Sequence, residues 1–113
     1  MRLFTIFILR TRKLSNPVRL MTAHVTVLLH AIFREIAGKK EITHDLNPNT
    51  TLQAVLNELA GKYGKDFKQI IDPKTGQIGV DTLVMLNGQS LRKTDVQLKD
   101  GDIIMISVPI GGG

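Results

Sequence analysis

The sequence predicts an α+β fold, in which a mixed sheet carries one main helix on one face and the chain ends in a flexible glycine tail. Three observations predict it. Apolar residues alternate with a period of two in several short segments, as is typical of strands. Residues 52–63 instead carry apolar residues at helical spacing. The last strand-like segment is followed, after Pro109 and Ile110, by Gly111, Gly112 and Gly113.

The first third of the chain contains two strand patterns. Residues 23–29 alternate between apolar and other side chains and predict a strand. Residues 33–38 suit a helical turn closed by Gly38. Residues 40–46 alternate again and predict a second strand, which Asn47-Pro48-Asn49 ends because Pro and Asn favour turns.

The clearest helix follows this turn. Thr50 and Gln53 have the spacing of a capping box, in which side chains satisfy free backbone donors at a helix start. Gly64 is a suitable residue to end the helix, and residues 66–71 predict a further helical turn before a loop at 72–76. The apolar residues of the helix form one stripe that we expect to pack on the sheet: Leu52, Val55, Leu56, Leu59 and Tyr63.

The last third predicts a hairpin and a final strand. Residues 82–86 form a strand pattern, and Asn87-Gly88 is a strong signal for a two-residue hairpin with a short return strand at 89–91. A tight turn at 99–102 leads into the final strand, 103–108. Two hairpins around one helix, with the chain finishing in a central strand, predict a ubiquitin-like β-grasp.

The two faces of this sheet differ in their expected role. If Val27, Val84 and Ile104 face the helix, the residues between them lie on the opposite face. A sheet usually exposes a polar face to water, whereas this one would expose Leu, Ile and Met side chains, which favours a partner-binding surface. Loops or residues 1–20 could instead cover it. The residues concerned are Leu28, Leu83, Met85, Ile103 and Met105.

Composition limits the function. A chain of 113 residues forms one domain. It has no cysteine, so disulfides, cysteine-based zinc sites and a thiol nucleophile are excluded. A reducing, cytoplasmic location is the default expectation. Residues 1–20 contain five basic residues and no acid, which accounts for the net charge of +5, so the remainder is balanced and no nucleic-acid partner is expected.

Residues 1–20 differ in kind from the rest. The apolar run Leu3–Leu9 is far shorter than the roughly 18 residues of a membrane span, so we expect no membrane association. It is followed by Arg10-Thr11-Arg12-Lys13 and not by the cleavage site of a signal peptide. The segment is an upstream extension or misassigned start, a transit peptide, or an added strand or partner-binding arm. We place the domain at 21–108 and the tail at 109–113.

Other candidate sites have simpler interpretations. The three histidines have no acid or cysteine at ligand spacing, so we expect strand histidines with polar neighbours and no metal. Asp100-Gly101-Asp102 lacks the length and final glutamate of a calcium loop and predicts a turn. No phosphate-binding loop, catalytic triad or carboxylate pair is present, so the chain is expected to bind no cofactor and to catalyse nothing alone.

Several segments resemble one family. Residues 27–31 and 33–38 are similar to the first strand and the "RELAG"-type segment of MoaD-type proteins, the small subunits of molybdopterin synthase within the MoaD/ThiS sulfur-carrier family. Leu86-Asn87-Gly88, the turn at 98–102 and the terminal Gly-Gly are similar as well. The resemblance covers residues 23–113. This family often has aromatic residues where His30 and Ser107 stand, and Pro-Pro where Val108-Pro109 stands.

The resemblance implies a role for the chain end. A ubiquitin-activating-enzyme-like adenylyltransferase would use ATP to adenylate Gly113, and a sulfur donor enzyme would convert the adenylate to a thiocarboxylate. The tail would then enter a MoaE-type large subunit and deliver sulfur to the pterin precursor. Gly111 and Gly112, with Pro109 and Ile110, would thread the tail. His30 and Ser107 would join the apolar sheet face in partner binding.

Three alternatives remain open at the level of sequence. A ubiquitin-like modifier would pass the same adenylate to lysine amines on other proteins. A thiamine-pathway sulfur carrier would use the same thiocarboxylate. A plain interaction domain would have incidental glycines, since chain ends are often glycine-rich and frayed.

Overall fold

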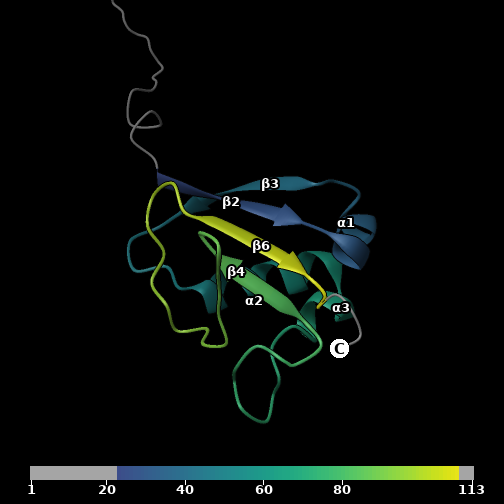
Figure 1. The fold of residues 1–113 in the computed structure, drawn as a ribbon. Coiled ribbons are helices and arrows are strands. Elements are labelled where there is room, and N and C mark those ends of the chain that lie inside the picture. Colours follow the sequence, from purple (N-terminus) through teal and green to yellow (C-terminus); the bar gives the residue numbers. More distant parts are fainter. Residues whose placement is uncertain (1–22, 110–113) are drawn as a thin grey trace, which may run out of the picture.

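The computed structural model describes residues 23–109, and the expected extension at 1–20 and the tail residues from Ile110 onward lie outside them. The described chain forms a five-stranded sheet with helices on one side (Figure 1). In chain order the elements are β2 (Ala23–Leu29), α1 (Ala31–Ala37), β3 (Glu41–Leu46), α2 (Leu52–Tyr63), α3 (Lys65–Lys68), β4 (Leu83–Leu86), β5 (Gln89–Ser90) and β6 (Ile103–Ser107).

The order of strands across the sheet is β3-β2-β6-β4-β5. β6 is therefore central, and it pairs in parallel with β2 and antiparallel with β4. β2–β3 and β4–β5 are the two antiparallel hairpins. In Figure 1 α2 lies behind the sheet, across its strands. This arrangement confirms the predicted ubiquitin-like β-grasp.

One core fills the space between α2 and the sheet. The predicted stripe of α2 is buried at Leu52, Val55, Leu56 and Leu59, and Tyr63 packs half-buried at its end. Each such side chain contributes roughly 1.5–3 kcal/mol by leaving water. The aromatic rings of Phe33 and Phe67 meet edge to face at 5.1 Å and extend the core under α1 and α3. From the sheet, this core takes Val25, Val27, Leu29, Val84, Ile104 and Ile106.

The start of α2 differs from the sequence prediction. The N-cap is Thr51, whose hydroxyl accepts the backbone N–H of Ala54 at 3.2 Å. The Thr50 hydroxyl instead donates to the carbonyl of Asn47 at 2.7 Å. The predicted capping box was wrong because a distant loop supplies acceptors: the N–H groups of residues 52 and 53 donate to the carbonyls of residues 96 and 94 at 2.9 and 2.8 Å.

The other predicted boundaries hold to within a few residues. Gly38 closes α1 with a φ of 74°, and Gly64 closes α2 by donating to the carbonyl of Ala60 at 2.9 Å. The helical turn predicted at 66–71 is shorter and earlier, at 65–68, because Ile71 pairs across the following loop with Ile78. Among residues 23–109 no helix is long and apolar enough to cross a membrane.

The Asn87-Gly88 turn is tied to the start of β6. Both residues have positive φ, 51° and 89°, as the predicted hairpin turn requires. The side chain of Asn87 accepts the N–H of Ile103 and donates to the buried carboxylate of Asp102, both at 2.9 Å. Asp102 also accepts the N–H of Lys99 at 2.7 Å. The turn at 99–102 thus serves a structural purpose.

The two threonines before α2 make a matched pair for testing the cap. Thr51→Ala should lower the free energy of unfolding by about 1 kcal/mol, because one donor of the first helical turn loses its acceptor. Thr50→Ala should lower it by roughly 0.5 kcal/mol or less, because the lost bond is exposed and outside the helix. Urea titrations followed by far-UV circular dichroism measure both. A larger loss for Thr50→Ala would contradict the cap assignment.

Candidate functional site

The candidate site begins with β6, since this strand leads to the chain end. Its inward residues Ile104 and Ile106 are fully buried, while Ile103 and Met105 alternate with them on the opposite side. After Ser107, Val108 is half-buried against the core and Pro109 is exposed. Proline has no N–H and cannot continue a ladder of hydrogen bonds. The last described residues therefore leave the sheet at the end of its central strand.

The side of the sheet away from α2, here called the outer face, carries the five predicted apolar residues. The strand register places Leu28, Met105 and Met85 directly opposite one another across β2, β6 and β4. Leu83 lies opposite Ser107, and Ile103 lies opposite Thr26. Residues opposite each other share a face, so the register brings these side chains together.

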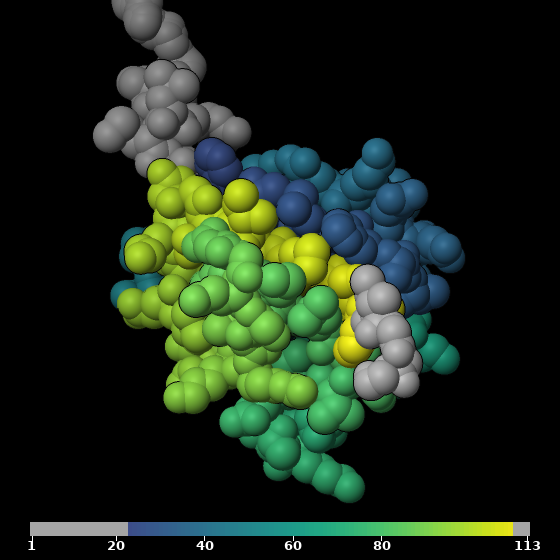
Figure 2. Space-filling model, viewed as in Figure 1, coloured from purple at the N-terminus to yellow at the C-terminus, as the bar shows by residue number. Residues whose placement is uncertain are grey.

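The outer face is only partly protected by the described chain. Ile103 is 46% exposed, and Leu28, Leu83, Met85 and Met105 are half-buried. Figure 2 views this face, on which the surface of β6 forms a band between those of β2 and β4. A contiguous Leu, Ile and Met surface on a sheet is typical of a site that binds another polypeptide.

The remaining predicted partner residues lie at the end of β6. His30 is exposed and directly precedes α1, and its backbone N–H donates to the carbonyl of Ile106 at 3.0 Å. Ser107 is 8% exposed. His30 is followed by Ala31, which has a φ of 55°, a conformation rare for a residue with a side chain. The structure therefore brings His30 and Ser107 to the position from which the chain end leaves. The tail residues Ile110, Gly111, Gly112 and Gly113 lie outside the described residues.

Sequence reasoning missed the acidic margin of the outer face. Glu41, Thr43 and Asp45 are the exposed residues of β3, and they lie opposite Leu28, Thr26 and His24. The period of two in residues 40–46 indicated which residues share a side of the strand. Only the pairing of β3 with β2 shows that Glu41 and Asp45 lie on the same face as the apolar residues.

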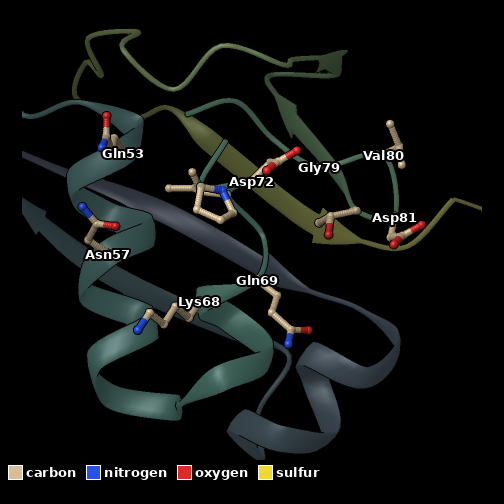
Figure 3. Close-up of a pocket in the computed structure, with 11 residues that line it drawn as sticks. Gln53, Asn57, Lys68, Gln69, Asp72, Gly79, Val80 and Asp81 are labelled. Carbon is tan, nitrogen blue, oxygen red and sulfur yellow. The ribbon is translucent and has the colours of Figure 1, made fainter. Parts of the chain in front are cut away.

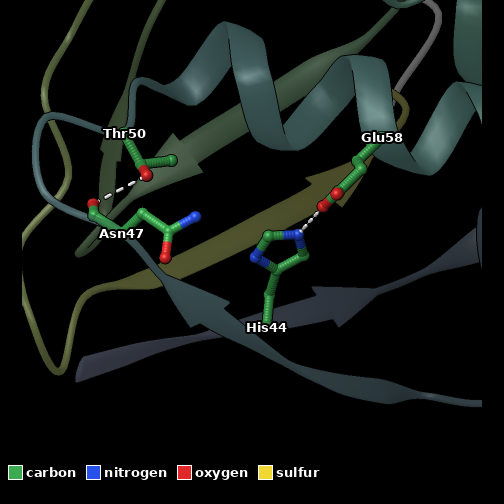
Figure 4. A network of polar contacts seen from close by, with 4 residues as sticks. All are labelled: His44, Asn47, Thr50 and Glu58. Carbon is green, nitrogen blue, oxygen red and sulfur yellow. Dashed lines mark hydrogen bonds and ion pairs between the residues drawn. The ribbon is translucent and has the colours of Figure 1, made fainter. Parts of the chain in front are cut away.

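His44 lies on the inner side of β3 and contacts the helix. Its Nε2 forms an ion-pair contact with Oε1 of Glu58 on α2, beside the Thr50–Asn47 bond (Figure 4). Its Nδ1 is buried and has no hydrogen-bond partner in the described structure. Within residues 23–109 no group of three or more His, Asp or Glu side chains is placed to hold a metal ion. The contact joins an edge strand to α2, and we assign it a structural role.

An open groove of about 610 Å³ lies on the helix side of the sheet. Figure 3 shows Gln53, Asn57 and Lys68 on one side of it and Val80 and Asp81 on the other. Its polar groups carry charges of both signs and do not converge on one point. Nothing in this arrangement resembles a catalytic constellation.

Comparison with known proteins finds a matching family and a similar protein. Residues 27–113 match the ThiS family. Small archaeal modifier protein 3 of Haloferax volcanii is 29% identical over 86 residues, which are 74% of this chain and 91% of that protein.

Two solved structures share the fold. A Haloferax volcanii protein solved in solution has a TM-score of 0.67 and 28% identity, over 81% of this chain and 88% of that one. A Pyrococcus furiosus protein described as subunit 1 of a molybdopterin converting factor has a TM-score of 0.60 and 25% identity, over 78% of this chain and 99% of that one.

The neighbours Ile103 and Ile104 test whether the outer face is separate from the core. Ile104→Ala should lower the free energy of unfolding by about 2–5 kcal/mol, because it opens a cavity in a fully buried site. Ile103→Ala should lower it by about 1 kcal/mol or less, because the side chain is already 46% exposed. Urea denaturation measures both. Equal losses would mean that the outer face belongs to the core.

Proposed function

The chain belongs to the ThiS family, and from this premise we propose that it is a sulfur carrier that works through the carboxylate of Gly113. The observation that carries the proposal is the position of β6. The strand is central, its inner side is fully buried, and its end leads directly out of the sheet to the glycines. The body of the domain would fix the point at which the last described residues leave the sheet, and the terminal residues would carry the chemistry.

The proposed chemistry takes place in a partner. A carboxylate oxygen of Gly113 attacks the α-phosphorus of ATP, and pyrophosphate leaves, which forms an acyl adenylate. Hydrosulfide supplied by a donor enzyme then attacks the carbonyl carbon and AMP leaves, and loss of the proton from sulfur gives the thiocarboxylate. An acyl adenylate is a mixed anhydride that water destroys, so the tail must enter a closed pocket. The glycines suit this entry because they carry no side chain.

This chain supplies position and recognition. The outer face would contact the adenylyltransferase and, later, the sulfur acceptor, with Leu28, Met85 and Met105 at its centre. His30 and Ser107 would lie at the margin nearest the tail. ATP would be bound by the partner, and we propose no cofactor for this chain. A need for ATP and reduced sulfur agrees with the expected cytoplasmic location.

We propose molybdopterin synthesis as the pathway, with a MoaE-type large subunit as the sulfur acceptor. The "RELAG"-type segment supports it, as does the fold shared with the Pyrococcus furiosus protein. A second candidate is conjugation of Gly113 to lysines of other proteins. The similarity to small archaeal modifier protein 3 over most of both chains favours this candidate. A thiamine-pathway carrier would share the first two steps.

The intact mass of the chain tests the sulfur-carrier role. After incubation with its adenylyltransferase, ATP and a sulfur source, the mass should rise by the difference between sulfur and oxygen. A chain lacking Gly112 and Gly113 should show no increase, while its unfolding transition stays unchanged because the core lies within the described residues. An unchanged mass for the full chain would contradict the proposal.

The molecule that accepts sulfur or the Gly113 acyl group distinguishes molybdopterin synthesis from conjugation to lysines. Thiocarboxylated chain mixed with a MoaE-type subunit and the pterin precursor should yield the dithiolene, detected by mass spectrometry. A ladder of higher bands on blots of cell extract, lost when Gly113 is deleted, would identify a modifier instead.

The outer face is tested by Met105→Glu. A carboxylate at the centre of the apolar row should weaken binding of the adenylyltransferase at least about tenfold, because the charge is buried unpaired in the complex. Asn57→Glu, exposed on α2, is the matched control and should bind normally. Isothermal titration calorimetry measures both. Equal affinities for the two variants would show that the partner binds elsewhere.

A further inference from the structure

Acidic and apolar side chains are distributed unevenly along the outer face. Its acidic part lies mainly where β2 begins: Asp45 is opposite His24, and Asp100 accepts the backbone N–H of His24 at 3.0 Å, while the third acidic residue, Glu41, lies opposite Leu28. Its apolar part lies toward the other end of β2, around Leu28 and Met105. Neither lysine nor arginine occurs on this face among the described residues of its strands. A complementary occupant would be basic near the start of β2 and apolar beyond it.

The chain itself contains such a segment, directly before β2. Counting back from Ala23, the residues are first basic, with Arg19, Lys13, Arg12 and Arg10, and then apolar, over Leu3–Leu9. From Asp45 and Asp100 toward Leu28 and Met105, the outer face changes from acidic to apolar in the same order, with Glu41 also beside Leu28. The segment contains no acidic residue that would be repelled there.

The chain between Leu9 and Ala23 is long enough to let Leu3–Leu9 reach the apolar part of the outer face. Residues 10–22 could span about 43 Å when extended, at roughly 3.3 Å per residue. The distance from Ala23 to Leu28 along β2 is about 17 Å by the rise of a strand. The segment can therefore cross from the acidic to the apolar part with slack. A tether of this length gives a local concentration on the order of millimolar, so weak docking suffices.

We propose that residues 3–13 dock on the outer face of their own chain. Leu3–Leu9 cover the apolar row, and Arg10, Arg12 and Lys13 lie near Asp45 and Asp100. The occupant is this segment because its charge, order and attachment match the face. If the face also binds the adenylyltransferase, which rests on the proposed function, the docked segment competes with that enzyme. Activation of the tail then requires displacement of the segment.

Paramagnetic relaxation tests the docking directly. The chain has no cysteine, so Thr5→Cys gives a single site for a nitroxide label. In the full chain with ¹³C-methyl methionine, the Met85 and Met105 signals should lose more than about half of their intensity relative to the reduced label, since both methyl groups would lie beneath the segment. The matched control adds Arg10→Glu, Arg12→Glu and Lys13→Glu, and should recover most of that intensity.

Two outcomes overturn the proposal. Loss of less than half of the Met85 and Met105 intensity in the labelled chain, or an equal loss in its charge-reversed control, would show that the segment does not dock there through its basic residues. Losses of the same size when nitroxide-labelled chains without isotope are mixed with isotope-labelled chains without nitroxide would show that the occupant is a second copy.

The consequence for function is measured separately. With about one tenth of the molecules undocked, the full chain should bind the adenylyltransferase about tenfold more weakly than a chain beginning at Met21. Equal affinities would overturn the competition. The relaxation experiment needs neither enzyme nor sulfur, so failure of docking leaves the sulfur-carrier proposal intact. Likewise, a chain that never acquires sulfur leaves the docking result unchanged.

Discussion

The placement of the last strand at the centre of the sheet is the constraint on which the rest of the structure depends. β6 is held on one side by parallel pairing with β2 and on the other by antiparallel pairing with β4. Its start is fastened by the buried carboxylate of Asp102, which accepts hydrogen bonds from Asn87 and Lys99. Within residues 23–109 no strand follows it, and Pro109 cannot donate to a ladder. Because β6 is held by these contacts, its position in the sheet does not depend on the residues that follow Pro109.

Alternate residues of β6 belong to the core and to the outer face. Ile104 and Ile106 face α2 and are fully buried, while Ile103 and Met105 face outward beside Leu28 and Met85. Because successive residues of a strand point to opposite faces, the two requirements fall on different residues. The outer residues are therefore free to serve a partner without cost to the core. The acidic margin formed by Glu41 and Asp45 places negative charge beside that surface.

Two polar features of the described domain lie away from the outer face. The groove between α2, α3 and the loop before β4 is open and holds charges of both signs. The His44–Glu58 contact fastens β3 to α2. Both features belong to the scaffold of the described domain.

Local sequence patterns were enough to predict the order of elements, the buried stripe of α2, the Asn87-Gly88 turn, and the inner and outer sets of sheet residues. Each of these depends on neighbouring residues, through periodicity or turn geometry, so a single chain segment encodes it. Three features became visible only in the folded chain: Thr51 caps α2 with help from the loop at 94–96, Asp102 accepts a hydrogen bond from Asn87, and Glu41 and Asp45 border the apolar face. These contacts join residues distant in sequence, and strand register and loop packing set them, which no local pattern specifies.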